Sequence, residues 1–375
     1  MCVPPDFAEQ LAGVGVPLVP SGPPVRLMMH GPVRPSEAEL PRRAAKLPAA
    51  QFDTVAEAAD GCDAIVAVGI MQVAARSVAE KLGIHYVFAN YQPVTLPSPH
   101  HPPLPFPGRP FPPEITDNRT LWDLDAQGWN ALFGASLNTL RASIGLSPVD
   151  DVRHHIFTGH PWLAADPTLG PWQEPADLDV VQTGAWILPD ERPLPEELEV
   201  FLDAGTPPVY VGFGSERAPK DIARVATEVI RAQGRRALVA CGWADLALID
   251  DRDDCFAVGE VNQQALFGRV AAVVHHGGAG TTTTAARAGV PQVLVPQRTD
   301  QPYWAGRVAG LGIGAAHDGP APTPESLSAA LRTALTPQTR ACAAAVAGAI
   351  RADGATVAAQ MLVDAVSRDR SPVPV

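Results

Sequence analysis

The stretch that follows residue 269 constrains the fold of this chain most strongly. Residues 270–274 form an uninterrupted apolar run, which is typical of a strand buried on both faces in a parallel sheet. The glycine-rich segment 276–280 comes next, and its glycines allow positive φ angles and let a ligand approach the backbone. Thr281 and Thr282 then predict the N-cap of a helix. The order of strand, glycine loop and helix predicts an α/β protein built on a parallel sheet.

The same loop is a candidate anion site. A helix that starts directly after a strand presents free N–H groups and a partial positive charge, which favour phosphate. We therefore predict a phosphate site made by Gly277, Gly278, Gly280 and Thr281, with His276 adding a hydrogen bond or a charge. The alternative interpretation is a turn whose glycines only permit close packing, because short glycine motifs occur often.

Two further strands lead into loops that could belong to this site. The apolar run 209–213 predicts a strand that delivers Ser215 to a loop, where its hydroxyl could hydrogen-bond a phosphate oxygen. The run 237–240 predicts another strand, and Trp243 follows it. Trp243 is either a core aromatic residue or a platform for a nucleotide base.

The motifs together resemble a known signature. H-G-G-A-G-T at 276–281, G-V-P at 289–291 and P-x-x-x-D-Q at 296–301 resemble the donor-binding signature of GT-B glycosyltransferases, which use nucleotide-activated sugars. Three other segments resemble, more narrowly, the glycosyltransferases of vancomycin-group glycopeptide antibiotics. They are V-Q-T-G-A-W at 181–186, P-V-Y-V-G-F-G-S at 208–215 and G-W-A-D-L at 242–246.

The resemblance implies a GT-B fold, with two Rossmann-like domains facing each other across a cleft and a last helix that crosses back to the first domain. We place an N-terminal acceptor-binding domain at 1–188, a Pro- and Glu-rich linker at 189–207, and a nucleotide-sugar-binding domain at 208–354. Residues 355–375 would form the last helix and a tail. The implied reaction is an inverting, metal-independent transfer of a sugar from a UDP- or dTDP-sugar to a hydroxyl of a glycopeptide aglycone, without a cofactor.

The resemblance also implies roles for single residues. His276 would face the leaving diphosphate, and Asp300 and Gln301 would contact sugar hydroxyls. The alternative for Asp300 is a helix N-cap, and both roles can coexist. In the family, the acceptor is deprotonated by an aspartate in a first strand–loop–helix unit, which precedes the segment resembling residues 1–5. The chain as given lacks that unit, so we expect the natural start to lie upstream, and Asp300 is the substitute candidate for a catalytic group.

A proline-rich segment at 93–113 favours extended backbone and cannot join a sheet. A loop of this length inside a compact domain is more often functional than idle. The resemblance places a variable loop over the acceptor here, while the alternative is a mobile surface loop. The residues predicted to contact the acceptor are His100, His101, Phe106, Arg109 and Phe111.

Charge and composition exclude some functions. The net charge of −12 argues against partners such as nucleic acid or an anionic membrane surface. No apolar run is long enough to span a bilayer, so we expect a cytoplasmic location. We also expect a monomer. The Asp-x-Asp triplets at 123–125 and 177–179 do not end apolar strands, and we interpret them as solvated acids rather than metal ligands. Arginine outnumbers lysine by 25 to 3, which suggests GC-rich coding, as in actinomycetes.

Three alternatives stay open at this point. The acceptor could be a macrolide or another polyketide. An epimerase of the same fold would share the phosphate site but would need additional carboxylates. A non-catalytic protein that binds nucleotide sugars is the third alternative.

Overall fold

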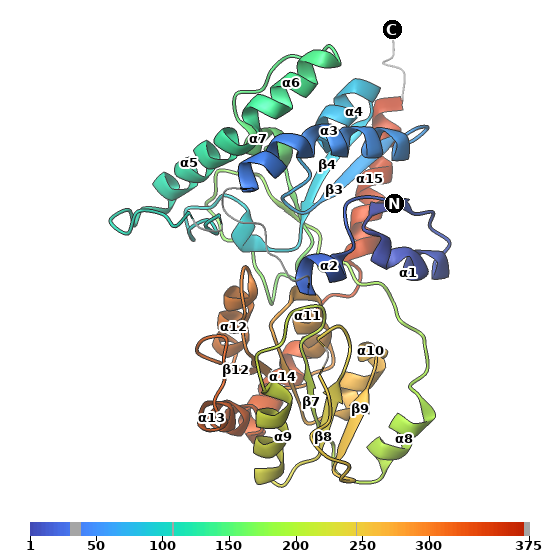
Figure 1. Cartoon of the computed structure of the whole chain (residues 1–375), viewed down its shortest axis with the longest axis vertical. Coiled ribbons are helices and arrows are strands. Elements are labelled where there is room, and N and C mark those ends of the chain that lie inside the picture. Colours follow the sequence, from blue (N-terminus) through green and yellow to red (C-terminus); the bar gives the residue numbers. More distant parts are fainter. Residues whose placement is uncertain (31–38, 107–108, 245, 371–375) are drawn as a thin grey trace. The chain divides into compact units, whose positions relative to one another are not determined.

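The computed structural model describes residues 1–30, 39–106, 109–244 and 246–370. The chain divides into two compact units by its internal contacts (Figure 1). The N-terminal unit contains residues 1–165, 172–184 and 353–375, and the C-terminal unit contains residues 166–171 and 185–352. The last helix, α15 (Gly354–Arg370), therefore belongs to the N-terminal unit, as the resemblance implies.

The N-terminal unit is built on a parallel sheet with the strand order β3-β4-β5-β6. Its strands are β3 (Ala64–Val68), β4 (His85–Asn90), β5 (Trp162–Leu163) and β6 (Val181–Gln182). The first strands, β1 (Cys2–Val3) and β2 (Val19–Pro20), pair with each other in a separate parallel sheet. The helices are α1 (Ala8–Gly13), α2 (Val25–His30), α3 (Leu40–Ala58), α4 (Ala75–Leu82), α5 (Asn118–Trp129), α6 (Ala135–Ser143) and α7 (Val152–Phe157).

Strands and helices alternate in this unit, and two segments depart from their simple sequence patterns. The apolar residues at 14–20 predict a strand, but only β2 forms there, because the amides of Val14 and Gly15 still bond to carbonyls of α1. The apolar spacing at 121–144 predicts a single helix, but a π-helical turn at Asn130–Gly134 separates α5 from α6. Gly83 ends α4 with a φ of 67°, as its position predicts.

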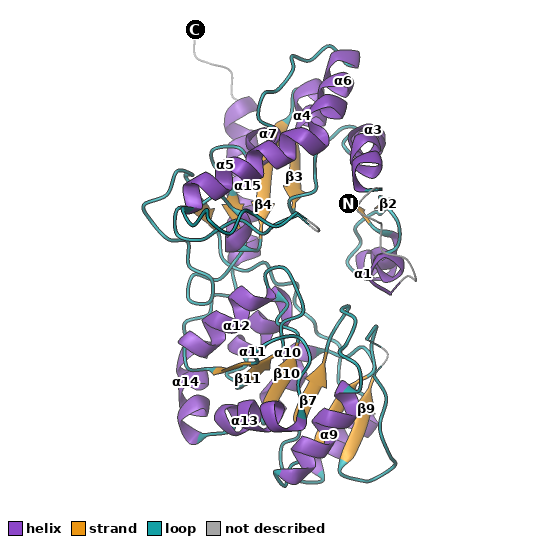
Figure 2. Cartoon of the chain, turned by 60° about the vertical axis from the view of Figure 1, so that its left-hand side comes forward, coloured by secondary structure: helices purple, strands orange, loops and turns teal. Residues whose placement is uncertain are grey.

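The C-terminal unit contains a six-stranded sheet that is parallel throughout, with the order β12-β11-β10-β7-β8-β9 (Figure 2). The strands are β7 (Val209–Gly212), β8 (Ala237–Ala240), β9 (Cys255–Val258), β10 (Ala272–His275), β11 (Gln292–Leu294) and β12 (Gly314–Ala316). The helices are α8 (Glu196–Asp203), α9 (Ile222–Ala232), α10 (Gln263–Leu266), α11 (Ala279–Arg287), α12 (Gln301–Gly310), α13 (Pro324–Ala334) and α14 (Pro337–Ala347).

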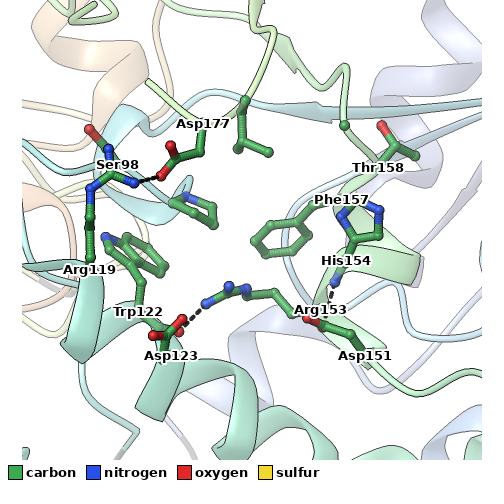
Figure 3. Close-up of a pocket in the computed structure, with 13 residues that line it drawn as sticks. Ser98, Arg119, Trp122, Asp123, Asp151, Arg153, His154, Phe157, Thr158 and Asp177 are labelled. Atoms are coloured by element: carbon green, nitrogen blue, oxygen red, sulfur yellow. Dashed lines mark hydrogen bonds and ion pairs between the residues drawn. The ribbon is translucent and has the colours of Figure 1, made fainter. Parts of the chain in front are cut away.

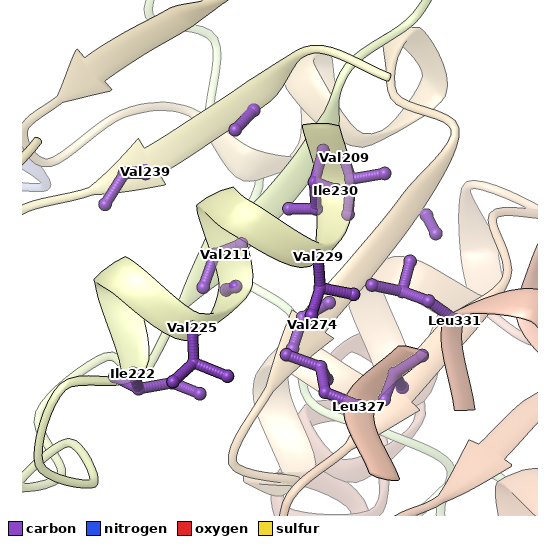
Figure 4. Packing of buried hydrophobic residues seen from close by; sticks show 14 of the residues in the cluster. Val209, Val211, Ile222, Val225, Val229, Ile230, Val239, Val274, Leu327 and Leu331 are labelled. Atoms are coloured by element: carbon purple, nitrogen blue, oxygen red, sulfur yellow. The ribbon is translucent and has the colours of Figure 1, made fainter. Parts of the chain in front are cut away.

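Apolar side chains cover both faces of this sheet. On one face, residues of α9 and α13 pack on alternate residues of β7, including Val209 and Val211 (Figure 4). On the other face, Tyr210 packs in a second cluster with Phe267 and Leu198. β10 contributes Val274 to the first cluster and Val273 to the second. The prediction of a strand buried on both faces is therefore confirmed for β10.

The segment 189–207, predicted as a linker, contains α8. Leu198, Phe201 and Leu202 of this helix are buried in the second cluster, and Arg269 forms ion pairs with Glu199 and Asp203. The glutamates that suggested a linker lie in an amphipathic helix, in which Glu196 and Glu197 favour the first turn. The residues of α8 are thus part of the C-terminal core.

Candidate functional site

The strand order of the C-terminal sheet reverses between the neighbouring strands β7 and β10, which makes their carboxyl ends a topological switch point. After β7 the chain adds β8 and β9 on one side, and β10 then lies on the other side of β7, with His275 in register with Gly212. The loops that leave β7 and β10 therefore diverge from neighbouring strand ends. Ligands of open α/β sheets bind at such switch points, so this edge is the candidate site.

His276 occupies the centre of this edge. Its side chain is only 8% exposed, and Nδ1 is buried without a hydrogen-bond partner among the described residues. Burial lowers the pKa of His276, Glu216 and Asp300 act in the opposite direction, and Arg298 lowers the pKa further. The imidazole is therefore neutral at pH 7. A buried nitrogen without a partner costs stability, and in a site it marks a position that a ligand oxygen can satisfy.

The glycines around His276 permit close packing of two loops. A Cβ on Gly278 would lie 2.5 Å from Nε2 of His276, and a Cβ on Gly214 would lie 3.3 Å from Cε1. Gly277 has a φ of 92°, which other residues rarely adopt. The glycines of this loop therefore have a packing role, which is compatible with an anion site.

Helix α11 begins earlier than the sequence predicts. Its N-cap is Gly278, without a side-chain cap, so the expected capping by Thr281 and Thr282 is wrong. The hydroxyl of Thr282 instead donates to the carbonyl of Gly278 at 2.9 Å, a bond that threonines make inside helices. The first helical amide bond runs from Thr282 N to Gly278 O at 3.0 Å. The amides of Ala279, Gly280 and Thr281 therefore precede the hydrogen-bonded part of the helix, which suits an anion.

Asp300 is buried beside this loop, with 5% of its surface exposed. It is the N-cap residue of α12, as the alternative predicts, although its side chain makes no capping hydrogen bond. Its carboxylate instead accepts from Nε1 of Trp304 at 2.7 Å and from the hydroxyl of Thr299 at 3.0 Å. Asp300 is thus held rigidly at the start of α12.

The side chain of Gln301 closes the loop between β11 and α12. Its Oε1 accepts from the amide of Gln297 at 2.7 Å and from that of Arg298 at 3.1 Å. Its Nε2 donates to Glu216 at 3.3 Å. Gln301 was expected to contact a sugar, and the structure shows that its amide also shapes the loop.

An ion pair that the motifs did not single out joins the two loops on either side of β10. The guanidinium of Arg298 donates to both carboxylate oxygens of Glu216, at 2.8 to 3.0 Å. Arg298 occupies one of the variable positions of P-x-x-x-D-Q, and Glu216 only follows Gly214 and Ser215, so neither stood out in the sequence. The pair places two opposite charges near His276, and they act on its pKa in opposite directions.

The remaining predicted donor residues lie at the same edge of the sheet. Ser215 is exposed in the loop after β7, and Trp243 is half-buried in the loop after β8. The sheet is parallel, so all these loops leave its carboxyl edge. Contact of Ser215 with phosphate, and of Trp243 with a base, stay predictions.

The predicted acceptor loop packs on helix α5. Phe106 contacts Trp129 edge to face at 5.7 Å, and His101 contacts Trp122 in the same way at 5.9 Å. His100 lies 3.0 Å from the carbonyl of Pro175. Arg109 is exposed and Phe111 is half-buried. His100, His101 and Phe106 are therefore held by contacts within the unit.

The acidic triplets are only partly solvated. Asp125 is 5% exposed and pairs with Arg153 at 3.2 Å, so its interpretation as a solvated acid is wrong. Asp123, Asp177 and Asp179 are exposed, as predicted. In the described ranges, no group of three or more His, Cys, Asp or Glu side chains could hold a metal ion. In the same ranges, no helix has the length and apolar character needed to cross a membrane.

Solved structures share this fold. The glycosyltransferase of kitacinnamycin has a TM-score of 0.71 at 18% identity, with 97% of this chain and 90% of that chain covered. The calicheamicin glycosyltransferase CalG4 has a TM-score of 0.69 at 18% identity, with 99% and 91% covered. Both likenesses show the GT-B fold, in which each of two units is built on a parallel sheet.

The sequence comparisons identify a narrower family within this fold. Residues 244–363 match the family described as erythromycin biosynthesis protein CIII-like, C-terminal domain. The chain is 59% identical to glycosyltransferase GtfE and 58% identical to vancomycin aglycone glucosyltransferase, both of Amycolatopsis orientalis. Each match covers 100% of this chain and 92% of the relative. The chain belongs to the vancomycin-group glycopeptide glycosyltransferases.

Proposed function

We propose that this enzyme transfers a sugar from a nucleoside-diphosphate sugar to a hydroxyl of a glycopeptide aglycone, with inversion at C1 and without a metal ion. The observation that carries the proposal is the buried, neutral His276 beside the open first turn of α11. The identity of 58% to vancomycin aglycone glucosyltransferase supports the class of acceptor.

The donor diphosphate would bind at the start of α11. The amides of Ala279, Gly280 and Thr281 would donate to its oxygens, and the hydroxyl of Ser215 would reach it from the loop after β7. Trp243 would stack on the base. The partly positive helix end balances part of the phosphate charge, and the guanidinium of Arg298, which is paired with Glu216, lies in a neighbouring loop.

Negative charge grows on the leaving diphosphate in the transition state. Preorganised donors at that position are usually the largest contribution to catalysis. As a neutral imidazole, His276 would donate one hydrogen bond to the leaving group from a buried position. Gly214 and Gly278 pack closely against the imidazole ring of His276 and would limit its motion. Asp300 is the second candidate for a catalytic group.

Asp300 and Gln301 would bind hydroxyls of the donor sugar. The carboxylate of Asp300 has capacity beyond its bonds to Trp304 and Thr299. Nε2 of Gln301 would exchange its 3.3 Å bond to Glu216 for a sugar oxygen.

The donor nucleotide is UDP or dTDP. The acceptor would bind to the N-terminal unit, with the loop at 93–113 in contact with it, and the enzyme would act as a cytoplasmic monomer.

Mass spectrometry of the acceptor tests this proposal. The protein is incubated with vancomycin aglycone and a panel of UDP- and dTDP-sugars, and a macrolide aglycone serves as the competing acceptor. We expect the mass of one sugar to be added to the glycopeptide only. Addition to the macrolide alone would overturn the acceptor class. Tight UDP binding without transfer to either acceptor would favour a non-catalytic binding protein.

A further inference from the structure

The N-terminal unit contains a cavity of about 420 Å³ that the donor site does not use. It lies between the start of α5, helix α7 and the segments before β5 and β6 (Figure 3). The residues that matter for its chemistry are Arg119, Trp122, Asp123, Arg153, Phe157 and Asp177. Its lining does not include the five residues predicted for the acceptor loop.

Two rigid aromatic rings belong to the apolar part of the cavity, together with Pro97 and Leu178. Trp122 is 5% exposed and Phe157 is 3% exposed. Nε1 of Trp122 donates to the carbonyl of His101 at 2.9 Å, and Phe157 stacks on Phe88 with ring centroids 4.6 Å apart. Both rings are therefore held in place before a ligand arrives, which keeps the entropy cost of binding low.

Both arginines that line the cavity are already paired with carboxylates. Arg153 pairs with Asp125 at 3.2 Å and lies over the ring of Trp122. Arg119 pairs with Asp177, which comes from the segment before β6 (Figure 3). These positive charges are therefore neutralised by neighbours.

The negative charge of the cavity is not balanced in the same way. Asp123 is exposed at the wall and makes no hydrogen bond or ion pair with the residues that the structure describes. Asp151, also at the wall, uses one oxygen to accept from the amide of His154 at 2.8 Å. The cavity thus places the exposed edges of two aromatic rings beside surplus carboxylate, and this combination favours a cation next to an apolar group.

The backbone conformation of Thr158, at the wall of the cavity, is a second observation that points to a ligand site. It lines the cavity with φ 62° and ψ −178°, a conformation in which β-branched residues are outliers. Its amide still donates to the carbonyl of His154 at 2.9 Å, which ends α7. Strained backbone of this kind persists where its surroundings impose it, often at ligand sites.

We propose that this cavity binds an aromatic ring that carries a protonated amine, with the ring against Trp122 and Phe157 and the ammonium at Asp123. The ligand could be part of a glycopeptide acceptor or a free aromatic amine. In the first case the inference rests on the proposed function, and in the second it does not.

Three phenols of similar shape and different charge test the binding chemistry. Tyramine is cationic, 4-ethylphenol is neutral and 3-(4-hydroxyphenyl)propionate is anionic, and each is titrated by following protein chemical shifts in NMR spectra. We expect tyramine to bind about tenfold more tightly than the propionate. Equal affinity for all three, or no binding of tyramine, would overturn the proposal.

Variants locate the site. Asp123→Asn should weaken tyramine binding about fivefold and leave 4-ethylphenol unchanged. The matched control Asp60→Asn, an exposed carboxylate outside the cavity, should change neither. Phe157→Leu should weaken all three phenols. Full tyramine affinity in Asp123→Asn would show that the ammonium binds elsewhere and would overturn the assignment.

A competition experiment distinguishes the two sources of the ligand. If vancomycin aglycone displaces tyramine, and Asp123→Asn raises the KM for the aglycone without changing UDP affinity, the cavity binds part of the acceptor. If tyramine binds and the aglycone does not displace it, the cavity takes a free aromatic amine. Because the tyramine titration needs no turnover, it remains decisive even if sugar transfer to the glycopeptide is not observed.

Discussion

Gly278 packs directly against the imidazole of His276, because a Cβ at this glycine would lie 2.5 Å from Nε2. The backbone conformation of Gly278, with φ −64° and ψ 142°, is open to any residue. The need for glycine therefore comes from His276 and not from the turn. This contact makes the geometry of the proposed leaving-group residue depend on its neighbour in the loop.

Gly278→Ala should displace the His276 ring and weaken UDP binding by about tenfold or more, since a positioned hydrogen bond is lost. Calorimetric titration of UDP measures this change. Gly306→Ala is the matched control, because its Cβ would meet nothing within 4 Å and alanine favours helix α12. An affinity of Gly278→Ala equal to that of the control would contradict the assigned position of His276.

The pair Glu216–Arg298 should tune the affinity for the diphosphate. Glu216→Gln removes a negative charge near the phosphate site and should tighten UDP binding about two- to fivefold, while Arg298→Ala should weaken it by a similar factor. Both changes should shrink in 0.5 M salt, because the Arg298 side chain is 44% exposed. Weaker binding in Glu216→Gln would instead mean that Glu216 acts mainly by holding Arg298 and Gln301.

Asp300→Asn should reduce discrimination between donor sugars more than it reduces nucleotide affinity. The amide can still accept from Trp304, so the start of α12 should be preserved, but the charge offered to sugar hydroxyls is lost. Competition kinetics with two UDP-hexoses measures the discrimination between donor sugars, and calorimetry with free UDP measures the affinity for the nucleotide. An equal loss in both would place Asp300 at the phosphates rather than at the sugar.

The main architecture followed from local patterns. The apolar run at 270–274, the glycine loop after it and the stop at Gly83 each depend on a few neighbouring residues, and all three are confirmed. The linker prediction was wrong because the prolines and glutamates of 189–207 do not reveal that Leu198 and Phe201 meet a core formed much later in the chain.

The details of the site were harder to predict for a similar reason. Thr281 and Thr282 are of a residue type that favours the N-cap position, but α11 begins before them, directly after Gly278. Likewise, Glu216 and Arg298 are separated by 82 positions and meet only because β7 and β11 flank β10. A pairwise contact of this kind leaves no local signature in the sequence.

Stability of the N-terminal unit should fall in mild acid because of His155. This buried histidine lies 3.2 Å from the hydroxyl of Ser77, and burial, assisted by Arg76 and Arg141, lowers its pKa to about 3. The unfolded chain takes up a proton below about pH 6.5 and the folded chain does not. The stabilisation is thus complete above about pH 6.5 and is lost as pH falls towards 3, by about 1.4 kcal/mol per pH unit.

Urea unfolding between pH 7 and pH 4 measures this slope. His155→Gln, which cannot titrate, should flatten it, and the exposed His160→Gln should leave it as in the wild type. A slope unchanged in His155→Gln would mean that groups other than His155 cause the acid sensitivity of the N-terminal unit.

Titration calorimetry of UDP and dTDP into the wild type and His276→Ala tests most directly whether the loop after β10 is the donor site. His160→Ala, which changes an exposed histidine of the N-terminal unit, is the matched control. We predict that His276→Ala keeps its fold by circular dichroism and binds the better nucleotide at least about tenfold more weakly than the control. Equal affinity for both nucleotides in His276→Ala and the control would remove His276 from the site and contradict the proposed mechanism.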